Sequence, residues 1–236
     1  EKYNLYVVED AAQAIDSYYT GRDGRKRALG SIGHLAAFSF HETKNIISGE
    51  GGVLVINDLQ FAGRAEIIWE KGTNRSAFFR GEVDKYNWVD IGSSFLPSEI
   101  TAAFLWAQLE CLDEIQCKRR EIWDTYYSIL RPLEVQGFLG LPDIPSYSSN
   151  NAHIFYILCS SREKRNNLIE AFRKEEIYSI FHYLSLHNSP FFKDKHDGRI
   201  LNQSDLFSDT LIRLPLFFNL ISDQIDRITE TIYNEY

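Results

Sequence analysis

Three short runs near the start of the chain are apolar on both faces rather than at alternate positions. They cover residues 5–8, 35–40 and 53–56. Continuous apolar strands are typical of a sheet that helices cover on both faces. The pattern therefore predicts three buried strands of an α/β fold, and the first of them ends directly at the carboxylates of Glu9 and Asp10.

Apolar residues at helical spacing predict helices after these strands. One pattern covers residues 58–71, and another begins near Pro97, which suits the first turn of a helix. This second pattern continues, with some break, to about residue 130. Between the two patterns, residues 72–90 are rich in Asn, Arg and Gly, so we expect a long loop there.

The rest of the chain predicts a second αβ unit. Strands are expected at residues 154–158 and 177–181. A capping-box pattern at Ser160 predicts the start of the helix between them, and Ser222 is a candidate N-cap for a last helix.

The composition shifts near residues 112–150, where prolines and a cluster of Ser and Asn residues fall. We expect a domain boundary there. Residues 1–115 would form the C-terminal part of a large α/β domain, and residues 116–236 a smaller α+β domain. The chain begins with Glu1 and contains no methionine, which we expect of a segment that starts inside a longer protein.

Composition narrows the function classes. Hydrophobic residues make up 44% and charged residues 25%, a globular balance that excludes a disordered chain, a fibre or a coiled coil. The net charge of −8 argues against a nucleic-acid-binding protein, and no apolar run approaches the roughly 20 residues that span a bilayer. The cysteine count of three is odd and no Cys-x-x-Cys motif occurs, which argues against a disulfide framework. We therefore expect a reducing, cytoplasmic compartment.

Asp10 stands where ligands bind in open α/β sheets, at the carboxyl end of a strand. There its carboxylate would pair with a protonated ring nitrogen. The alternative is structural: Asp10 would cap a helix at residues 11–18.

A second constellation lies between residues 38 and 52. Ser39 ends the second strand, Lys44 lies on the turn that follows, and a glycine-rich stretch leads into the third strand. A partly desolvated lysine loses its proton more easily, and its neutral amine forms a Schiff base with an aldehyde. Ser39 and nearby backbone N–H groups would hold a phosphate. The alternative is a surface hairpin with a solvated lysine.

Together, a carboxylate for a ring nitrogen, a hydroxyl for a phosphate and an amine for an aldehyde describe a site for pyridoxal 5′-phosphate (PLP). In such sites the carboxylate keeps the pyridine nitrogen protonated, so that the ring draws electrons from the substrate. No single one of the three groups predicts this cofactor.

The same segments carry a resemblance to a known family. Residues 10–13 (DAAQ), 38–45 (FSFHETKN) and 49–52 (GEGG) resemble the acidic and lysine motifs of the DegT/StrS-type sugar aminotransferases. The five-residue step from Ser39 to Lys44 also matches. The resemblance covers essentially the whole chain and implies the α/β fold of a fold-type I PLP-dependent transferase.

The resemblance also implies roles for individual residues. Lys44 would bond to PLP and move the proton at the sugar carbon that is aminated. Asp10 would hold the pyridine nitrogen, Gln13 would contact the ring or its hydroxyl, and Ser39 would bind the phosphate. Family dimers share their active sites, so Asn87 would contact the phosphate in the neighbouring subunit of a homodimer.

A narrower resemblance concerns relatives that transfer an amino group from L-glutamate to a 4-keto-6-deoxy sugar nucleotide for surface polysaccharides. It rests on residues 70–76, 78–81, 84–86, 88–94, 151–153, 181–183 and 214–217. Another keto sugar or a keto cyclitol is the alternative substrate, and a non-catalytic PLP-fold protein is the alternative class. The family's early phosphate loop and ring-stacking aromatic residue would lie upstream of this sequence, which leaves open the activity of the chain alone.

Other side chains are candidates for substrate contacts. His182 and His187 lie in the predicted small domain, with surface or interface histidines as the equal alternative. Arg75 and Arg80 suit the diphosphate of a nucleotide, with a solvated loop as the alternative. His41 lines either the pocket or a dimer interface. We predict no metal site and no nucleic-acid or membrane partner.

Overall fold

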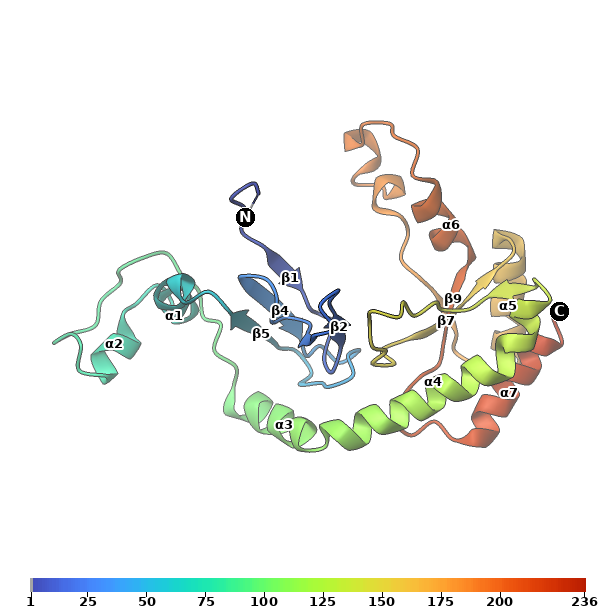
Figure 1. Cartoon of the computed structure of the whole chain (residues 1–236), viewed down its shortest axis with the longest axis horizontal. Helices are drawn as coiled ribbons and strands as arrows, with labels where there is room; N and C mark the ends of the chain where they lie inside the picture. Colours follow the sequence, from blue (N-terminus) through green and yellow to red (C-terminus); the bar gives the residue numbers. More distant parts are fainter. Residues whose placement is uncertain (1) are drawn as a thin grey trace. The chain divides into compact units, whose positions relative to one another are not determined.

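Two units make up the chain in the computed structural model, which describes residues 2–236 (Figure 1). Unit 1 contains the chain up to Ile115 together with Ser146–Asn151, and unit 2 contains Gln116–Pro145 and Ala152–Tyr236. One division between the units falls between Ile115 and Gln116. The segment Ser146–Asn151 belongs to unit 1, although residues 116–236 were predicted to form one domain.

A three-stranded sheet forms the centre of unit 1, in the order β1 (Val8–Asp10), β4 (Leu35–Ser39) and β5 (Gly52–Ile56). β1 runs parallel to β4, and β5 runs antiparallel to it. The first strand was predicted at residues 5–8 and lies further along the chain. Its bounds follow from its pairing with β4, which begins at Leu35, rather than from the apolar run.

A polar hairpin accompanies this sheet, formed by β2 (Tyr18–Thr20) and β3 (Lys26–Ala28). The backbone N–H of Thr20 donates to the carbonyl of Tyr147, at 2.7 Å, and Ser149 donates to the carbonyl of Tyr18, at 3.0 Å. These bonds explain why Ser146–Asn151 belongs to unit 1.

Short helices complete unit 1. They are η1 (Leu59–Phe61), α1 (Ala62–Trp69), α2 (Arg75–Phe79) and α3 (Glu99–Glu110). α2 lies inside the predicted loop. Ser98 caps α3, because its Oγ accepts a hydrogen bond from the N–H of Thr101 at 3.1 Å, so Pro97 precedes the helix rather than lying in its first turn.

Unit 2 contains an antiparallel sheet with strand order β6-β7-β9-β8. Its strands are β6 (Leu139–Gly140), β7 (Phe155–Cys159), β8 (Ile180–Phe181) and β9 (Leu211–Leu214). Its helices are α5 (Arg162–Lys174), η2 (Leu186–Asn188), η3 (Lys193–Lys195), α6 (Asn202–Thr210) and α7 (Ser222–Tyr233), together with most of α4 (Leu112–Val135).

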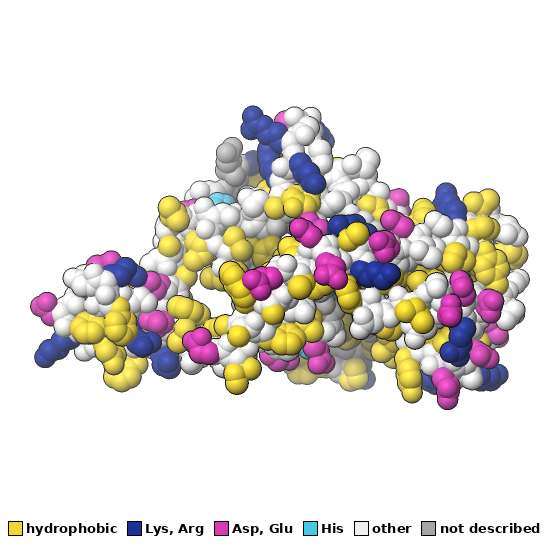
Figure 2. Space-filling model, turned by 90° about the horizontal axis from the view of Figure 1, so that it is seen from below, with side chains coloured by type: hydrophobic (Ala, Val, Ile, Leu, Met, Phe, Trp, Pro, Cys, Tyr) yellow, Lys and Arg dark blue, Asp and Glu magenta, His cyan; other side chains and the backbone are white. Residues whose placement is uncertain are grey.

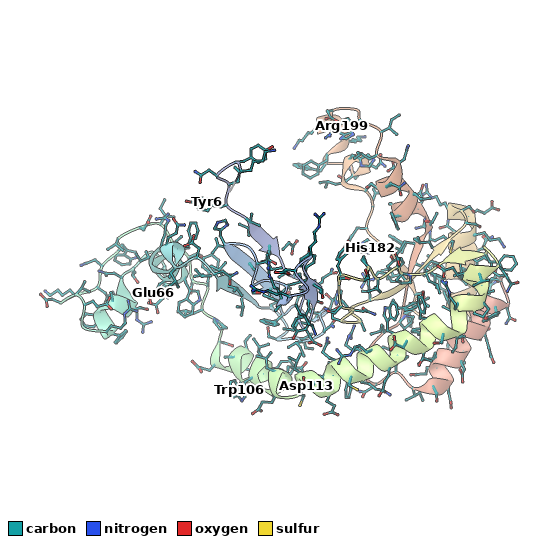
Figure 3. All side chains as sticks on the ribbon, in the orientation of Figure 1. Tyr6, Glu66, Trp106, Asp113, His182 and Arg199 are labelled. Carbon is teal, nitrogen blue, oxygen red and sulfur yellow. The ribbon has the colours of Figure 1, made fainter. Side chains whose placement is uncertain are left out.

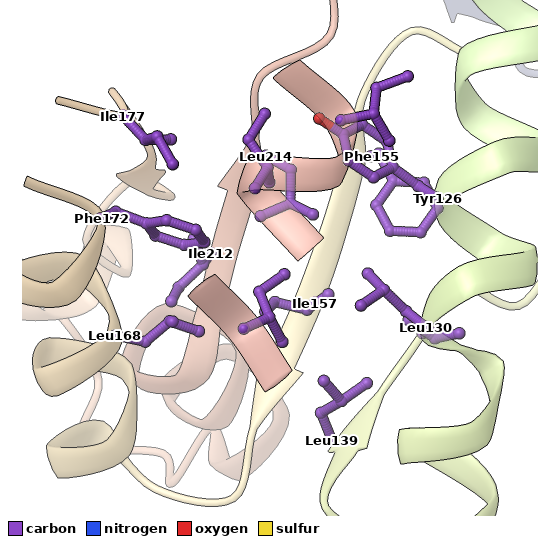
Figure 4. Packing of buried hydrophobic residues seen from close by; sticks show 14 of the residues in the cluster. Tyr126, Leu130, Leu139, Phe155, Ile157, Leu168, Phe172, Ile177, Ile212 and Leu214 are labelled. Atoms are coloured by element: carbon purple, nitrogen blue, oxygen red, sulfur yellow. The ribbon is translucent and has the colours of Figure 1, made fainter. Parts of the chain in front are cut away.

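One apolar core holds unit 2 together (Figure 4). Tyr126 on α4 packs against Phe155 on β7, with ring centroids 5.1 Å apart. Phe172 on α5 and Ile212 on β9 are completely buried in the same cluster. Side chains from three helices and three strands therefore stabilise this unit by burial of apolar surface.

The ends of three helices in unit 2 differ from the sequence prediction. Ser161, not Ser160, caps α5 and accepts from the N–H of Lys164 at 3.1 Å. Ser222 is the first residue of α7 rather than its N-cap. α4 continues through Pro132, which lies in its last turn and cannot donate a hydrogen bond to the carbonyl four residues earlier. No helix between residues 2 and 236 is both long and apolar enough to cross a membrane.

Candidate active site

Asp10 and Ser39 lie at the carboxyl ends of two neighbouring parallel strands. Asp10 on β1 pairs with Ala37 on β4, and Ser39 is two residues further along β4. Side chains two apart on a strand share a face, so these three side chains lie on one face of the sheet. Gly52 pairs with Ser39 from β5 and adds no side chain to that face.

The two adjacent carboxylates at the end of β1 do different things. Glu9, on the opposite face from Asp10, accepts hydrogen bonds from the backbone N–H groups of Gly30 (2.8 Å), Ile32 (2.7 Å) and Gly33 (2.6 Å). Burial acts to raise the pKa of Glu9, but the bonds from Gly33, Gly30 and Ile32 outweigh it and hold the pKa below its usual value. Glu9 is therefore a structural residue, whereas Asp10 stays exposed.

After Asp10 the chain forms two turns instead of the helix at residues 11–18 that the structural alternative required. The N–H of Ala11 still donates to the carbonyl of Ala37, at 3.0 Å, and Oδ1 of Asp10 accepts from the N–H of Ala12, at 3.1 Å. Asp10 thus closes a local turn with one oxygen. Gln13 is exposed on the same segment.

Lys44 lies on the turn between β4 and β5. Its backbone N–H donates to the carbonyl of His41 at 2.9 Å, and the N–H of His41 donates to Oγ of Ser39 at 3.3 Å. Nε2 of His41 lies 3.6 Å from a carboxylate oxygen of Glu50. The Lys44 side chain is half-buried, and within residues 2–236 its amine makes no hydrogen bond or ion pair. This amine is available for a ligand.

Buried residues directly after Lys44 fix the turn. Ile46 is completely buried and packs with Phe40 and Ile115. Nδ2 of Asn45 donates to the backbone carbonyl of Asn151 at 2.8 Å. Asn45 and Asn151 both fall in segments that carry the family resemblance, but no local pattern predicts a role in the site for either of them.

The donor set fits PLP. Asp10 offers a carboxylate oxygen to a protonated ring nitrogen, Ser39 offers a hydroxyl to a phosphate, and Lys44 offers an amine to an aldehyde. Ala37 and Gly52 have small or no side chains, so neither places a bulky group over the sheet face next to Asp10 and Ser39. Ala37 is exposed. These residues would hold the cofactor. Their roles stay predictions.

Asn87 lies on a loop with a well-defined backbone. Its N–H donates to Oδ1 of Asn74 at 2.7 Å, and the N–H of Asn74 donates to the carbonyl of Asn87 at 3.2 Å. Gly72, which has a φ of +77°, lies directly against Gly92, and a Cβ on either glycine would overlap with the other segment. Asn87 itself is exposed on this loop.

Arg75 and Arg80 already have protein partners. Arg80 donates to both carboxylate oxygens of Glu66 on α1, at 2.7 and 2.9 Å, and to Glu82 at 2.7 and 3.1 Å. Glu66 is labelled in Figure 3. Arg75 lies 3.6 Å from the buried carboxylate of Glu70. Their predicted contact with a nucleotide diphosphate would compete with these ion pairs.

The candidate histidines of unit 2 differ from each other. Nδ1 of His182 is buried and lacks a hydrogen-bond partner among the described residues (Figure 3). Burial, and then the charge of Arg213, lower the pKa of His182 below its usual value. His187 instead lies 2.9 Å from a carboxylate oxygen of Asp205. Across residues 2–236, no three His, Cys, Asp or Glu side chains are grouped as metal ligands.

Comparison with known proteins places these observations in a family. The model of the DegT/DnrJ/EryC1/StrS aminotransferase family matches residues 1–233. PseC from Helicobacter pylori, an aminotransferase involved in the biosynthesis of pseudoaminic acid, is 22% identical, with a TM-score of 0.86 over 100% of this chain and 60% of its own. DesV from S. venezuelae, solved in complex with a ketimine intermediate, is 27% identical, with a TM-score of 0.83 over 99% of this chain and 58% of its own.

A third structure carries the predicted cofactor. The PLP form of the putative sugar aminotransferase Spr1654 from Streptococcus pneumoniae is 23% identical, with a TM-score of 0.82 over 98% of this chain and 57% of its own. The predicted α/β fold of a PLP-dependent transferase is confirmed by these matches. The chain spans about 60% of the length of the solved structures that it matches.

Proposed function

The chain belongs to the DegT/DnrJ/EryC1/StrS aminotransferase family, and from that premise we propose that it acts as a PLP-dependent sugar aminotransferase. Aminotransferases of this family are PLP-dependent, and a solved relative is known in both a PLP form and a PMP form. The cofactor prediction is confirmed at that level. One observation supports the proposal most directly: Asp10 and Ser39 share a sheet face, and the unpaired amine of Lys44 lies on the turn that follows.

Each of the three residues has a distinct task in this proposal. Asp10 holds a proton on the ring nitrogen, because a carboxylate favours the positively charged form of its partner. Ser39 anchors the phosphate and so fixes the orientation of the ring. Lys44 would hold the aldehyde of the cofactor, and its free amine would take up and return the proton at the reacting carbon. When bound, PLP supplies the ring that withdraws electrons from that carbon.

The proposed reaction moves an amino group from L-glutamate to a 4-keto-6-deoxy sugar nucleotide. The narrower sequence resemblance supports dTDP-4-keto-6-deoxy-D-glucose as acceptor and dTDP-4-amino-4,6-dideoxy-D-galactose as product, for lipopolysaccharide or enterobacterial common antigen. His41, His182 and His187 are the proposed sugar contacts. Arg75 and Arg80 reach the diphosphate in this scheme only by exchanging their carboxylate partners.

We further propose a homodimer in which each site is completed by the neighbouring subunit. Asn87 is the proposed phosphate contact from that subunit. Its neighbours Tyr86, Trp88 and Val89 are large apolar side chains that are more than half exposed, which supports an interface at this loop.

Visible absorption of the chain with PLP tests the proposed function. A lysine-linked band that L-glutamate removes, and that the keto sugar nucleotide restores, is expected for the wild-type chain. Lys44→Ala should abolish the band and lower amino transfer more than about thousandfold. The control Lys174→Ala, on the exposed surface of α5, should retain both.

The remaining outcomes separate the alternatives. A glutamate response that only another keto sugar or a keto cyclitol reverses would replace the acceptor and keep the reaction. Absence of a band in the wild-type chain, together with unchanged biological function in Lys44→Ala, would favour a non-catalytic protein.

A further inference from the structure

Asn151 connects two segments that each lie beyond the end of a strand. Its Nδ2 donates to the backbone carbonyls of Gln13 (2.7 Å) and Ile15 (2.9 Å), on the segment that follows Asp10. Its own backbone carbonyl accepts from Nδ2 of Asn45, the residue directly after Lys44. One residue thus binds the chain next to the proposed carboxylate and the chain next to the proposed amine.

Both asparagine side chains are buried. Asn45 is 6% exposed and Asn151 is 7% exposed. Both N–H groups of the Asn151 amide are used on two carbonyls, so its side chain holds one orientation. Buried amides that are fully paired make rigid connections, because a loss of one bond costs the desolvation of its partner.

The two connected segments have little regular structure of their own. Residues 11–17 form turns, and residues 41–50 form the loop between β4 and β5. Ile15 also packs against the small cluster of Phe40 and Ile46. The asparagines therefore add directional hydrogen bonds between residues 11–17 and residues 41–50. Apolar packing alone would fix the relative position of these two segments less precisely.

We propose that Asn45 and Asn151 are positioning residues that keep the amine of Lys44 in register with the carboxylate of Asp10. The inference rests on the proposed function, because register between these two groups matters only for a ligand that binds both. A displacement of about 1 Å between groups that act on one ligand is enough to lower its reaction rate by about a hundredfold.

Asn57, which is exposed, supplies a control in the same unit that is matched in its hydrogen bonds. Its Nδ2 also donates to two backbone carbonyls, of Gly30 (2.9 Å) and Gly33 (3.0 Å). Asn57 directly follows β5, at the opposite end of the β4–β5 pair from Lys44. Loss of its amide also removes two hydrogen bonds to backbone carbonyls, but neither of them involves the two connected segments.

The test measures PLP binding and the pH dependence of the visible band in Asn151→Ala, Asn151→Asp, Asn45→Ala and Asn57→Ala. We expect the Asn151 and Asn45 variants to bind PLP about tenfold or more weakly and to show a shifted pH midpoint of the band. Asn57→Ala should keep the PLP affinity within about twofold and leave the pH midpoint unchanged. We expect this even where its melting temperature falls as far as that of the Asn151 variants. Hydrogen exchange without PLP should rise in residues 11–17 and 41–48 together in Asn151→Ala.

The double variant Asn45→Ala with Asn151→Ala gives a second readout. If the two residues form one connection, its loss of PLP affinity should be no larger than that of the more damaging single variant. Losses that multiply would contradict a shared connection.

Failure of the inference and failure of the proposed function are distinguishable. A wild-type band that stays unchanged in the Asn151 variants, or that weakens equally in Asn57→Ala, overturns the positioning role and leaves the proposed function intact. No band in the wild-type chain, together with unchanged biological function in Lys44→Ala, overturns the proposed function, and the positioning role with it.

Discussion

Unit 2 buries its apolar side chains in one continuous core, whereas unit 1 leaves many of its own in contact with solvent. The core of unit 2 joins α4, α5 and α7 to three strands. The buried cluster of unit 1 consists of Phe40, Ile46 and Ile115. On α3, Ile100 is 84% and Trp106 66% exposed, and Trp106 is labelled in Figure 3. Figure 2 shows many hydrophobic side chains at the surface. Unit 2 therefore derives its stability from packing, and unit 1 depends much more on hydrogen bonds between loops.

This difference separates stability from chemistry. The proposed cofactor residues of unit 1 lie at strand ends and on turns, where functional side chains concentrate because the scaffold around them carries the fold. Substitutions in the core of unit 2 should change the free energy of unfolding. Substitutions of Lys44 itself should change ligand binding at similar stability.

The largest effect on stability is expected in the core of unit 2. Phe172→Ala would leave a cavity in a completely buried site and should lower the free energy of unfolding by about 3–5 kcal/mol. The control Ile100→Ala on α3 of unit 1 should change it by no more than about 0.5 kcal/mol. Denaturant titration measures both, and equal losses would break the contrast between the units.

A smaller loss is expected in the loop that carries Asn87. Gly72→Ala would force a side chain into a positive φ and against the backbone of Asp90, and should cost at least about 2 kcal/mol. Gly81→Ala is the control, because Gly81 also has a positive φ (+74°) but open space around it, and should cost about 1 kcal/mol. Thermal unfolding checks the difference, and equal costs would argue against the close approach.

Substitutions of Glu9 and Asp10, the adjacent carboxylates of β1, should affect different properties: stability for Glu9 and PLP binding for Asp10. Glu9→Gln loses a charged acceptor for the backbone of residues 30–33 and should cost about 1 kcal/mol. Asp10→Asn should leave stability unchanged and weaken PLP binding instead. Exchanged phenotypes would contradict the assignment of the two residues.

Glu9 also predicts a pH dependence. Its pKa is lower in the folded chain than in the unfolded chain. The stabilisation is therefore fully present above the ordinary glutamate pKa of about 4.3 and is lost as the pH falls through the folded value. Unfolding of the wild type and of Glu9→Gln, followed from pH 7 to pH 3, should converge, and parallel curves would contradict this account.

The smallest effect is expected at His182. Its pKa is lowered in the folded chain, so the unfolded chain takes up a proton first as the pH falls below about 6.5. Stability should fall on acidification from pH 7.5 to pH 5.5 by less than about 1 kcal/mol. His182→Gln should show a smaller fall in melting temperature over this range, and an identical fall would contradict the shift.

The sequence predicted those parts of the fold whose signals are local. The strands β4, β5 and β7 were predicted because they are apolar at nearly every position, and Asp10, Ser39 and Lys44 because strand ends and spacing point to them. β2 and β3 were missed, since polar residues fill this hairpin and only pairing defines it.

Long-range contacts explain most of what was missed. Asn45 and Asn151 are 106 residues apart in sequence, and neither has a local pattern that signals their bond. The start of β1 depends on its partner strand in the same way. At the start of α5, two adjacent serines compete for the N-cap, and the structure selects Ser161.

The most direct test of the central claim is the identity of the residue that binds PLP. Borohydride reduction of the chain with PLP, followed by mass spectrometry of its peptides, reports the modified lysine. The account predicts the modification at Lys44, and none at other lysines above the level found in Lys44→Ala. Modification spread evenly over exposed lysines, or unchanged in Lys44→Ala, would contradict the claim that unit 1 holds the cofactor through this turn.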